Sequence, residues 1–272
     1  MITREVVTMK ELGKILEGTW PGSSANLLPE NCVLCGSPLK AVQMPSGKWV
    51  HAKCPCVVAD FEKRQKDLVK REKKERIERL FENSGLGERF KKCSLDNWYR
   101  RPGTDKAYEA ACRYNENISN NVRDGKGLVI FGTYGNGKSH LAAAIANTTI
   151  RQGMTTVFER VPSLLAKIRA TYGGDGDITE YQLLKALTDA DLVVLDDAGA
   201  EKWTEWAESM LYTVIDERYS YQKALIITTN SNLNELEKKI GIRAMDRVLE
   251  MCEIVENKGT SFRKERARLR KN

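Results

Sequence analysis

Residues 132–139 of this chain read Gly132-Thr133-Tyr134-Gly135-Asn136-Gly137-Lys138-Ser139 and match the pattern G-x-x-x-x-G-K-[ST] at every fixed position. An apolar run, Leu128-Val129-Ile130-Phe131, precedes this stretch, and a helix-forming run, residues 140–146, follows it. A strand, a glycine-rich loop and a helix in this order form a loop whose backbone N–H groups surround phosphate oxygens. A glycine turn that only happens to precede a helix is the alternative, and the complete match disfavours it.

The residue types in this loop predict an ATP site that uses Mg²⁺. Lys138 would contact the β- and γ-phosphates, and the hydroxyl of Ser139 would bind Mg²⁺. We expect the whole loop and the residue after it to line the site: Gly132, Thr133, Tyr134, Gly135, Asn136, Gly137, Lys138, Ser139 and His140.

A second acidic motif follows a predicted buried strand. The apolar run 192–195 ends in Asp196 and Asp197, with Asp196 58 residues after Lys138. Because the carboxyl ends of strands in open α/β sheets face the ligand crevice, both carboxylates should lie beside the phosphate loop. We expect Asp196 to help hold Mg²⁺ and Asp197 to orient the attacking water.

Short apolar strands alternate with helical segments from about residue 88 onward. This order predicts an α/β fold, a P-loop NTPase with a parallel sheet flanked by helices. Strands are expected at 128–131, 156–159, 192–195, 224–228 and 252–256. Helices are expected at 138–152, 162–172, 179–189 and 203–221, with a helical pair over 232–250 that breaks at Gly241.

The composition is that of a globular protein without a membrane span. The chain has 272 residues, 41% of them hydrophobic, and no apolar run approaches the roughly 20 residues that a transmembrane helix needs. Residues 1–5 lack the apolar core of a signal peptide. Seven cysteines without an export signal indicate reduced thiols or metal ligands. We therefore expect a cytoplasmic protein with no membrane partner.

Four of the cysteines form a predicted zinc site. Cys32-x-x-Cys35 is followed, after eighteen residues, by Cys54-x-Cys56. Four thiolates in a reducing compartment favour structural Zn²⁺ over a disulfide. Cys-x-Cys is less usual than Cys-x-x-Cys as a second pair, so His51 could replace Cys54 or Cys56. A segment this poor in apolar side chains would need the metal to fold.

A highly charged segment separates this cluster from the phosphate loop. Residues 59–83 contain nine basic and seven acidic side chains and neither Gly nor Pro. Opposite charges at helical spacing, such as Glu72 and Arg76, predict a solvated connecting helix, which could also bind a partner. Residues 258–272 hold seven basic side chains against one Glu, which is typical of a solvated tail or of one that contacts nucleic acid. The expected domains are a zinc module at 1–58, a charged linker helix at 59–87 and an ATPase domain at 88–272.

Five motifs occur in a fixed order: the phosphate loop, LVVLDDAGAEKWTEW from residue 192, ITTNSNLNEL from 227, GIRAMDRVLEM from 241 and KGTSFR from 258. Together they resemble the DnaC/DnaI family of bacterial helicase loaders, and the transposition helper IstB shares much of the set. The similarity covers about residues 88–265. It implies an ATPase domain of the AAA+ class that associates with its own kind around ATP.

The resemblance also implies roles for single residues. Asn230 would be sensor 1, which touches the γ-phosphate or the attacking water; the alternative is a strand end before a helix cap at Asn232. Arg247 would be the arginine finger that enters the neighbouring subunit's ATP site, with Arg243 as the alternate. Arg263 would be sensor 2 and contact ATP, or it is an ordinary surface cation of the basic tail.

Residues 161–173 match the place where initiator-type AAA+ proteins insert a DNA-contacting helix. Lys167 and Arg169 would neutralise DNA phosphates, and the ring of Tyr172 would stack on a base. The alternative is a solvated helix that ends in a tyrosine.

The resemblance implies a loader whose N-terminal module binds the replicative DNA helicase and whose ATPase domain binds single-stranded DNA. A transposition helper of the IstB type is one rival, against which the cysteine module argues. An adaptor that binds ATP with negligible turnover is another. Most AAA+ ATPases carry Glu where this chain has Asp197, so hydrolysis should be slow. A P-loop nucleoside kinase is disfavoured because it would not need Asn230, Arg247 and Arg263 in this order.

Overall fold

The structure is a computed structural model that describes residues 31–43, 45, 49–81, 86–173, 178–200 and 204–269. The chain divides into two compact units, Met1–Glu72 and Lys73–Asn272, which we describe separately. Among the helices of the described residues, none combines the length and apolar character that crossing a bilayer requires.

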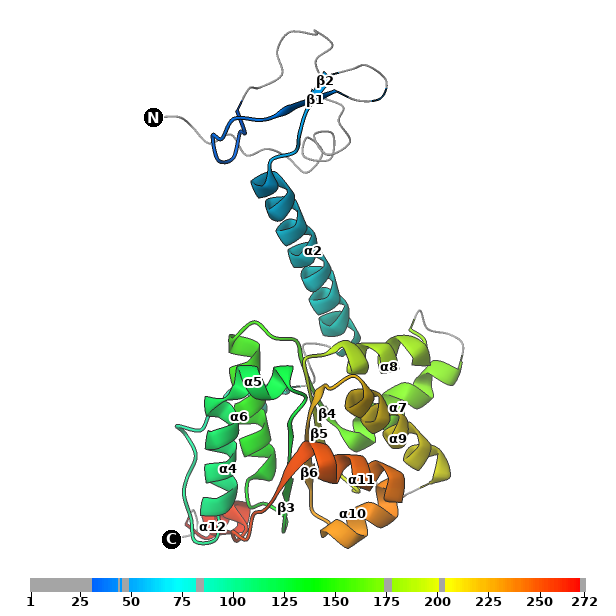
Figure 1. The fold of residues 1–272 in the computed structure, drawn as a ribbon. Coiled ribbons are helices and arrows are strands. Elements are labelled where there is room, and N and C mark those ends of the chain that lie inside the picture. Colours follow the sequence, from blue (N-terminus) through cyan, green and yellow to red (C-terminus); the bar gives the residue numbers. More distant parts are fainter. Residues whose placement is uncertain are drawn as a thin grey trace. The chain divides into compact units, whose positions relative to one another are not determined.

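The first unit contains Cys32, Cys35, Cys54 and Cys56 and a short antiparallel pair of strands. β1 (Ala41–Gln43) pairs with β2 (Trp49–His51). α2 (Pro55–Phe81) starts in this unit and has 27 residues (Figure 1). It carries ion pairs at helical spacing, such as Arg64 with Asp60 at 2.7 Å. The predicted linker helix is present, but it begins at Pro55 rather than at residue 59, because proline is tolerated in the first helical turn. The domain boundaries at 58 and 87 stay a prediction.

The second unit is built on a five-stranded parallel sheet. Its strands are β3 (Gly127–Phe131), β4 (Thr156–Arg160), β5 (Leu192–Ala198), β6 (Ala224–Thr229) and β7 (Cys252–Glu256). Their order in the sheet is β4-β5-β6-β3-β7, and every pairing is parallel. This confirms the predicted α/β fold. β3, which leads into the phosphate loop, lies next to β6 and one strand away from β5.

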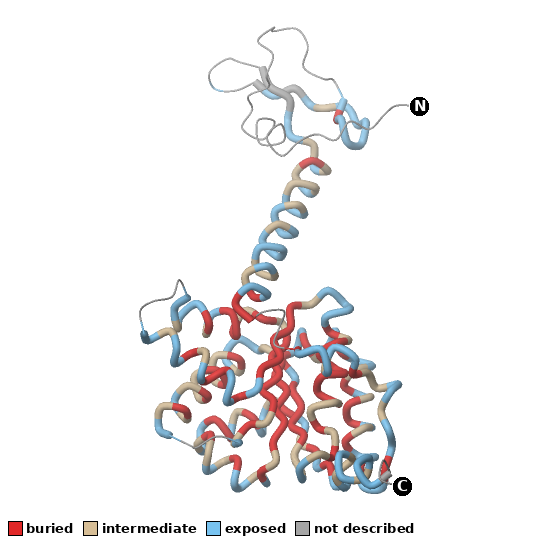
Figure 2. The backbone as a smooth tube through the Cα atoms, turned by 180° about the vertical axis from the view of Figure 1, so that it is seen from behind, coloured by how far each residue is buried: buried red, intermediate tan, exposed pale blue. Residues whose placement is uncertain are grey.

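Helices cover both faces of the sheet. On one face lie α7 (Val161–Ala170), α8 (Glu180–Asp189), α9 (Glu205–Ser220), α10 (Leu233–Ile240) and α11 (Ile242–Met251). On the other lie α4 (Asp105–Glu116), α5 (Ile118–Arg123) and α6 (Lys138–Arg151). Side chains alternate along a strand, so Val129 packs in the first layer and Leu128 and Ile130 in the second. Figure 2 shows the buried residues gathered along the strands.

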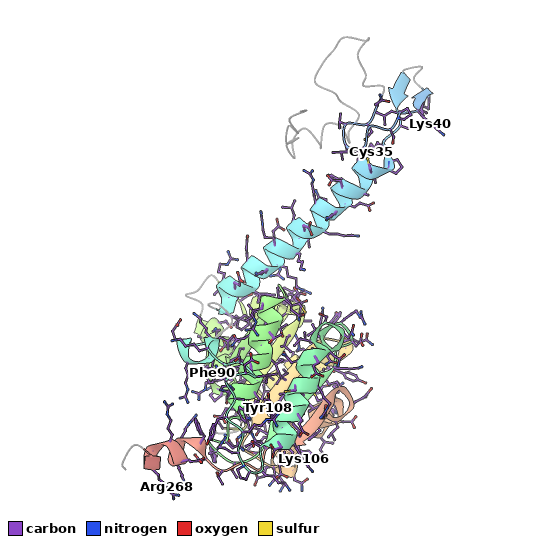
Figure 3. The ribbon with its side chains drawn as sticks, turned by 90° about the vertical axis from the view of Figure 1, so that its left-hand side faces the viewer. Cys35, Lys40, Phe90, Lys106, Tyr108 and Arg268 are labelled. Atoms are coloured by element: carbon purple, nitrogen blue, oxygen red, sulfur yellow. The ribbon has the colours of Figure 1, made fainter. Side chains whose placement is uncertain are left out.

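Five elements before β3 are not predicted from the sequence: β1 and β2 of the first unit, and α3 (Glu88–Lys91), α4 and α5 of the second. The buried face of α4 consists of Ala107, Ala110, Ala111 and Tyr114. Figure 3, in which Lys106 and Tyr108 of α4 are labelled, shows this helix from its outer side. Further along, α7 ends at Ala170, and Tyr172 lies in a 3₁₀ turn, Thr171–Gly173, rather than in the predicted helix.

Candidate functional site

The phosphate loop connects β3 to α6 at the edge where the parallel strands end. Gly137 directly precedes α6 and has a φ of 104°, a left-handed conformation that favours glycine. A Cβ atom at Gly137 would lie 2.5 Å from the ring of Trp98, so the neighbouring chain also excludes a side chain. Glycine is therefore required at the last position before the helix, as the motif predicts.

Lys138 is nearly buried, with 6% of its surface exposed. Its Nζ donates hydrogen bonds to the carbonyl oxygens of Gly132 (2.9 Å) and Thr133 (2.7 Å) and to Oδ1 of Asn230 (2.8 Å). Burial lowers the pKa of Lys138 from 10.5 to about 8, and the charges of Asp197 and Asp196 oppose this shift. The ammonium group is thus held by neutral oxygens, which phosphate oxygens could replace.

Asp196 is 1% exposed at the end of the buried part of β5. Thr228 donates a hydrogen bond of 2.6 Å to its Oδ1, whereas its Oδ2 is buried without a hydrogen-bond partner among the described residues. Nε of Arg160 lies 4.0 Å from that oxygen. Desolvation raises the pKa of Asp196, while hydrogen bonds from Thr228 and Ser139 lower it. The unpartnered carboxylate oxygen of Asp196 and the hydroxyl of Ser139 are oxygen ligands of the kind that Mg²⁺ binds.

Asp197 has a positive φ of 58°, which is uncommon for a residue other than glycine. The pairing of β5 with β6 shifts register between Leu195 and Ala198, so a bulge places Asp197 at the partly exposed strand end. Nδ2 of Asn230 donates a hydrogen bond to Oδ1 of Asp197. Because Asn230 also accepts from Lys138, these three residues form one hydrogen-bonded chain across the phosphate loop, β5 and the end of β6.

Arg263 and His140 were also predicted to contact ATP, and their surroundings in the structure differ. Arg263 is exposed in α12 (Phe262–Leu269), and its charge lowers the pKa of Lys138, so the fold brings it into electrostatic range of the loop. The ring of His140 packs 5.4 Å from that of Trp98, and its Nε2 lies 2.9 Å from the carbonyl oxygen of Ser94. The His140 imidazole is therefore engaged with protein groups.

The two finger candidates on α11 have contrasting environments. Nη2 of Arg247 lies 2.6 Å from Oδ1 of Asp216, and its guanidinium stacks 5.0 Å from the ring of Tyr212. Arg243 is exposed, and no side-chain hydrogen bond or ion pair engages it within the described part of the chain. A single subunit thus holds Arg247 in place and leaves Arg243 open to solvent.

The three predicted DNA-contacting residues are not equivalent. Nζ of Lys167 lies 2.9 Å from Oε1 of Glu159. The guanidinium of Arg169 stacks on the ring of Trp206 at 4.4 Å, and Nε1 of Trp206 donates to the Tyr172 hydroxyl at 3.1 Å. Arg169, Tyr172 and Trp206 therefore form one aromatic and cationic cluster, from which Lys167 is separate.

Sequence reasoning did not identify three residues at the phosphate-loop edge: Arg101, Arg160 and Thr228. Arg160 ends β4 directly opposite Asp196, and Thr228, the last residue but one of β6, lies beside it. Both are polar residues at the ends of predicted strands, a signal that could have found them. Arg101 precedes α4, and no local pattern marks it.

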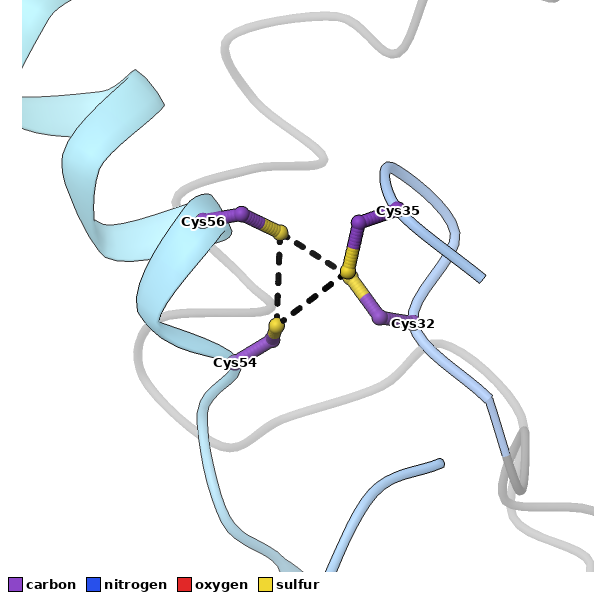
Figure 4. Close-up of side chains that lie close together, drawn as sticks. All are labelled: Cys32, Cys35, Cys54 and Cys56. Carbon is purple, nitrogen blue, oxygen red and sulfur yellow. Dashed lines mark hydrogen bonds between the residues drawn. The ribbon is translucent and has the colours of Figure 1, made fainter. Parts of the chain in front are cut away.

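The side chains of Cys32, Cys35, Cys54 and Cys56 lie close together in the first unit (Figure 4). Their sulfur atoms all lie within 4.8 Å of one another, with 3.4 Å between Cys32 and Cys56 and 3.5 Å between Cys35 and Cys54. Zinc–thiolate bonds of about 2.3 Å in a tetrahedron place sulfur atoms roughly 3.8 Å apart, so the cluster fits Zn²⁺. His51 lies in β2, and its side chain is outside the described part of the structure.

The lowered pKa of Lys138 predicts a pH dependence of nucleotide binding. Phosphate binds the ammonium form, which the nucleotide-free site loses as the pH rises through about 8. We expect ATP affinity to be level below pH 8 and to fall about tenfold per unit above it, with proton uptake on binding. Calorimetric titrations at pH 7, 8 and 9, in buffers of different ionisation enthalpy, measure both quantities.

The lowered pKa of Lys138 also affects folding stability, which should rise with pH where the ATP affinity falls. The unfolded chain holds the Lys138 proton up to about pH 10.5 and the folded chain only to about pH 8, so this lysine makes the nucleotide-free protein more stable as the pH rises between those values. An ATP affinity that stays constant from pH 7 to 9 would contradict the assignment of Lys138 to the phosphates.

Comparison with known families places residues 57–270 in the family described as IstB-like ATP binding protein. The replicative helicase loader DnaC of Buchnera aphidicola subsp. Acyrthosiphon pisum is 28% identical over 182 residues, which are 66% of this chain and 73% of that protein. The replicative helicase loader DnaC of Escherichia coli K12 is 30% identical over 174 residues, 64% of this chain and 69% of that protein.

A crystal structure of the DnaC helicase loader has a similar fold. It superposes with a TM-score of 0.57 at 26% identity and covers 63% of this chain and 100% of the solved one. The motif resemblance found in the sequence is thereby confirmed by relatives and by fold.

Proposed function

This chain belongs to the family of IstB-like ATP-binding proteins, and on that premise we propose that it is an ATPase that helps to load a replicative helicase onto DNA. The two sequence relatives described above are both named replicative helicase loaders. Nucleotide binding and the role in DNA replication follow from this kinship. The residues that act, the partners and the slow rate are our further assignments.

One arrangement carries the proposal: the hydrogen-bonded chain Lys138–Asn230–Asp197 beside the buried carboxylate of Asp196. Lys138 would bind the β- and γ-phosphates, and Ser139 and Asp196 would hold Mg²⁺, which neutralises phosphate charge. Asp197 would accept a proton from the attacking water, and Asn230 would hold that water in line. Arg263 would add positive charge at the γ-phosphate.

The cysteine cluster supports an N-terminal zinc module, which we assign to residues 1–58 as the part that binds the helicase. Cys32, Cys35, Cys54 and Cys56 would hold the metal. Cys54 directly precedes α2 and Cys56 is the second residue of this helix, so the metal would tie the N-terminal segment to α2.

Self-association completes the proposed ATP site. Arg247 of one subunit would enter its neighbour's site after release from Asp216, and an arginine supplied in this way stabilises the charge of the transition state. The exposed guanidinium of Arg243, one turn earlier on α11, is the alternate.

An adaptor that binds ATP with negligible turnover is the second candidate function. Asp197 favours it, because this side chain is one methylene shorter than Glu and is already hydrogen-bonded to Asn230. Rates of ATP hydrolysis by the full chain, with and without single-stranded DNA, separate the two functions. Hydrolysis that DNA stimulates supports the loader, whereas ATP binding without hydrolysis under either condition supports the adaptor.

The DNA surface has its own test. We assign it to the cluster of Arg169, Tyr172 and Trp206. Arg169→Ala should weaken single-stranded DNA binding and reduce the slope of log affinity against log salt by about 1. Lys106→Ala is the matched control, because Lys106 is an exposed cation on α4, across the sheet from α7. Fluorescence anisotropy with a labelled oligonucleotide measures both, and an equal loss in the two variants would contradict the assignment.

A further inference from the structure

The phosphate loop is hydrogen-bonded at several positions to a segment near the C-terminal end of the chain. We call residues 257–262 the C-terminal strap. Nδ2 of Asn136 donates to the carbonyl oxygen of Asn257 at 2.6 Å, and the backbone N–H of Phe262 donates to the carbonyl oxygen of Gly135 at 2.9 Å. The Thr133 hydroxyl adds a longer bond of 3.3 Å to the strap. The strap leads into α12, whose outer end Figure 3 marks at Arg268, so its placement sets the position of Arg263.

Arg101 joins the loop to the strap. Its Nη2 donates to the carbonyl oxygen of Asn136 at 2.7 Å, and its Nη1 donates to that of Thr260 at 2.6 Å. The two acceptors are 35 and 159 residues away in the sequence. The guanidinium also lies 5.1 Å from the ring of Phe262. One planar group therefore spans both segments, with one N–H arm on each.

Burying the charge of Arg101 costs free energy of desolvation. This cost indicates that the contact has a role beyond packing. Arg101 is 7% exposed, and its Nε is buried without a partner among the described residues. Desolvation lowers its pKa, while the charge of Glu265 raises it. Removing a guanidinium from water is unfavourable unless its donors are well satisfied, and the rigid fork of arginine suits two separate acceptors as lysine does not.

We propose that Arg101 is a positioning residue of the nucleotide site. It holds the C-terminal strap on the phosphate loop and thereby places Arg263 close to Lys138, so that the site binds ATP in preference to ADP. The proposal rests on the assignment of this site to ATP. ATP alone would place a γ-phosphate between the two cations, so a displaced Arg263 affects ATP and leaves ADP bound as before. Phe262, the residue before Arg263, donates its backbone N–H to the carbonyl oxygen of Gly135, which supports the proximity of Arg263 to the phosphate loop.

The test compares affinities for a non-hydrolysable ATP analogue and for ADP, measured by calorimetry on the full chain. Arg101→Met should weaken binding of the analogue by about tenfold, the effect expected for a lost hydrogen bond to a charged group, and change the ADP affinity little. Arg101→Lys keeps the charge but can reach one carbonyl, so it should show an intermediate loss. Arg100→Ala is the matched control, because its neighbouring guanidinium lies over the ring of Tyr108 and does not touch the loop.

A double variant separates positioning from a general loss of structure. If Arg101 acts through Arg263, then Arg101→Met should add almost nothing to Arg263→Ala. An additive effect, or an equal loss of ATP-analogue and ADP affinity, would overturn the proposal. The same criteria apply to Arg101→Lys should Arg101→Met fail to show a cooperative thermal transition. Wild-type protein that binds neither nucleotide would refute the ATP assignment itself, whereas wild type that binds both equally would refute only the role of Arg101.

Discussion

Subunits that carry Arg247→Ala and subunits that carry Lys138→Ala should each be inactive alone and regain ATP hydrolysis when mixed. Lys138→Ala removes the phosphate-binding ammonium, so its own site should lose ATP, but it still presents Arg247 to a neighbour. Arg247→Ala should bind ATP normally and lack the finger. Arginine fingers supplied by another subunit are worth roughly 10³–10⁵ in rate, so even a slow ATPase should show the recovery. Phosphate release, measured against the mixing ratio, gives the readout.

Controls decide which arginine acts. Both single variants must be folded and must co-assemble, which thermal melting and sedimentation establish. Arg243→Ala, mixed in the same way with Lys138→Ala, is the internal comparison. Recovery with Arg243→Ala, together with normal activity of Arg247→Ala alone, would transfer the role to Arg243. A mixture that co-assembles and stays inactive in both cases would refute a finger on α11.

The second large effect concerns the metal. Cys32→Ser or Cys35→Ser should release zinc and unfold the N-terminal module, because structural Zn²⁺ contributes on the order of 10–16 kcal/mol to the folding of zinc-finger peptides. The ATPase domain has its own core on both faces of the sheet and should stay folded and bind ATP. Elemental analysis and limited proteolysis measure the two consequences, and we expect about one zinc per chain in wild type.

The matched control is Cys112→Ser, which changes a thiol on α4 that lies outside the cluster. It should keep its zinc and its resistance to proteolysis. Retention of zinc at the wild-type level in both Cys32→Ser and Cys35→Ser would show that the four sulfur atoms are not the ligand set.

Much of the ATPase fold follows from local patterns. The predicted strands match β3 to β7 within three residues at each end. The first four rest on short, buried apolar runs that are bounded by polar or turn residues. The helices α3, α4 and α5 were not predicted, and α7 was predicted too long. Asp196, Asp197 and Asn230 could be placed together because parallel strands end at one edge.

The sequence by itself determined the phosphate loop, the order of strands and helices from β3 to β7, and which four cysteines lie together, because each depends on residue types at short, regular spacing. Only the tertiary structure decided which charges are buried and by what they are held. Arg218 is fully buried and donates to the carbonyl oxygens of Ala190 and Ala224, and Arg101 bridges the phosphate loop and the C-terminal strap. Such contacts join residues far apart along the chain, and their free energy depends on desolvation, which no local pattern records.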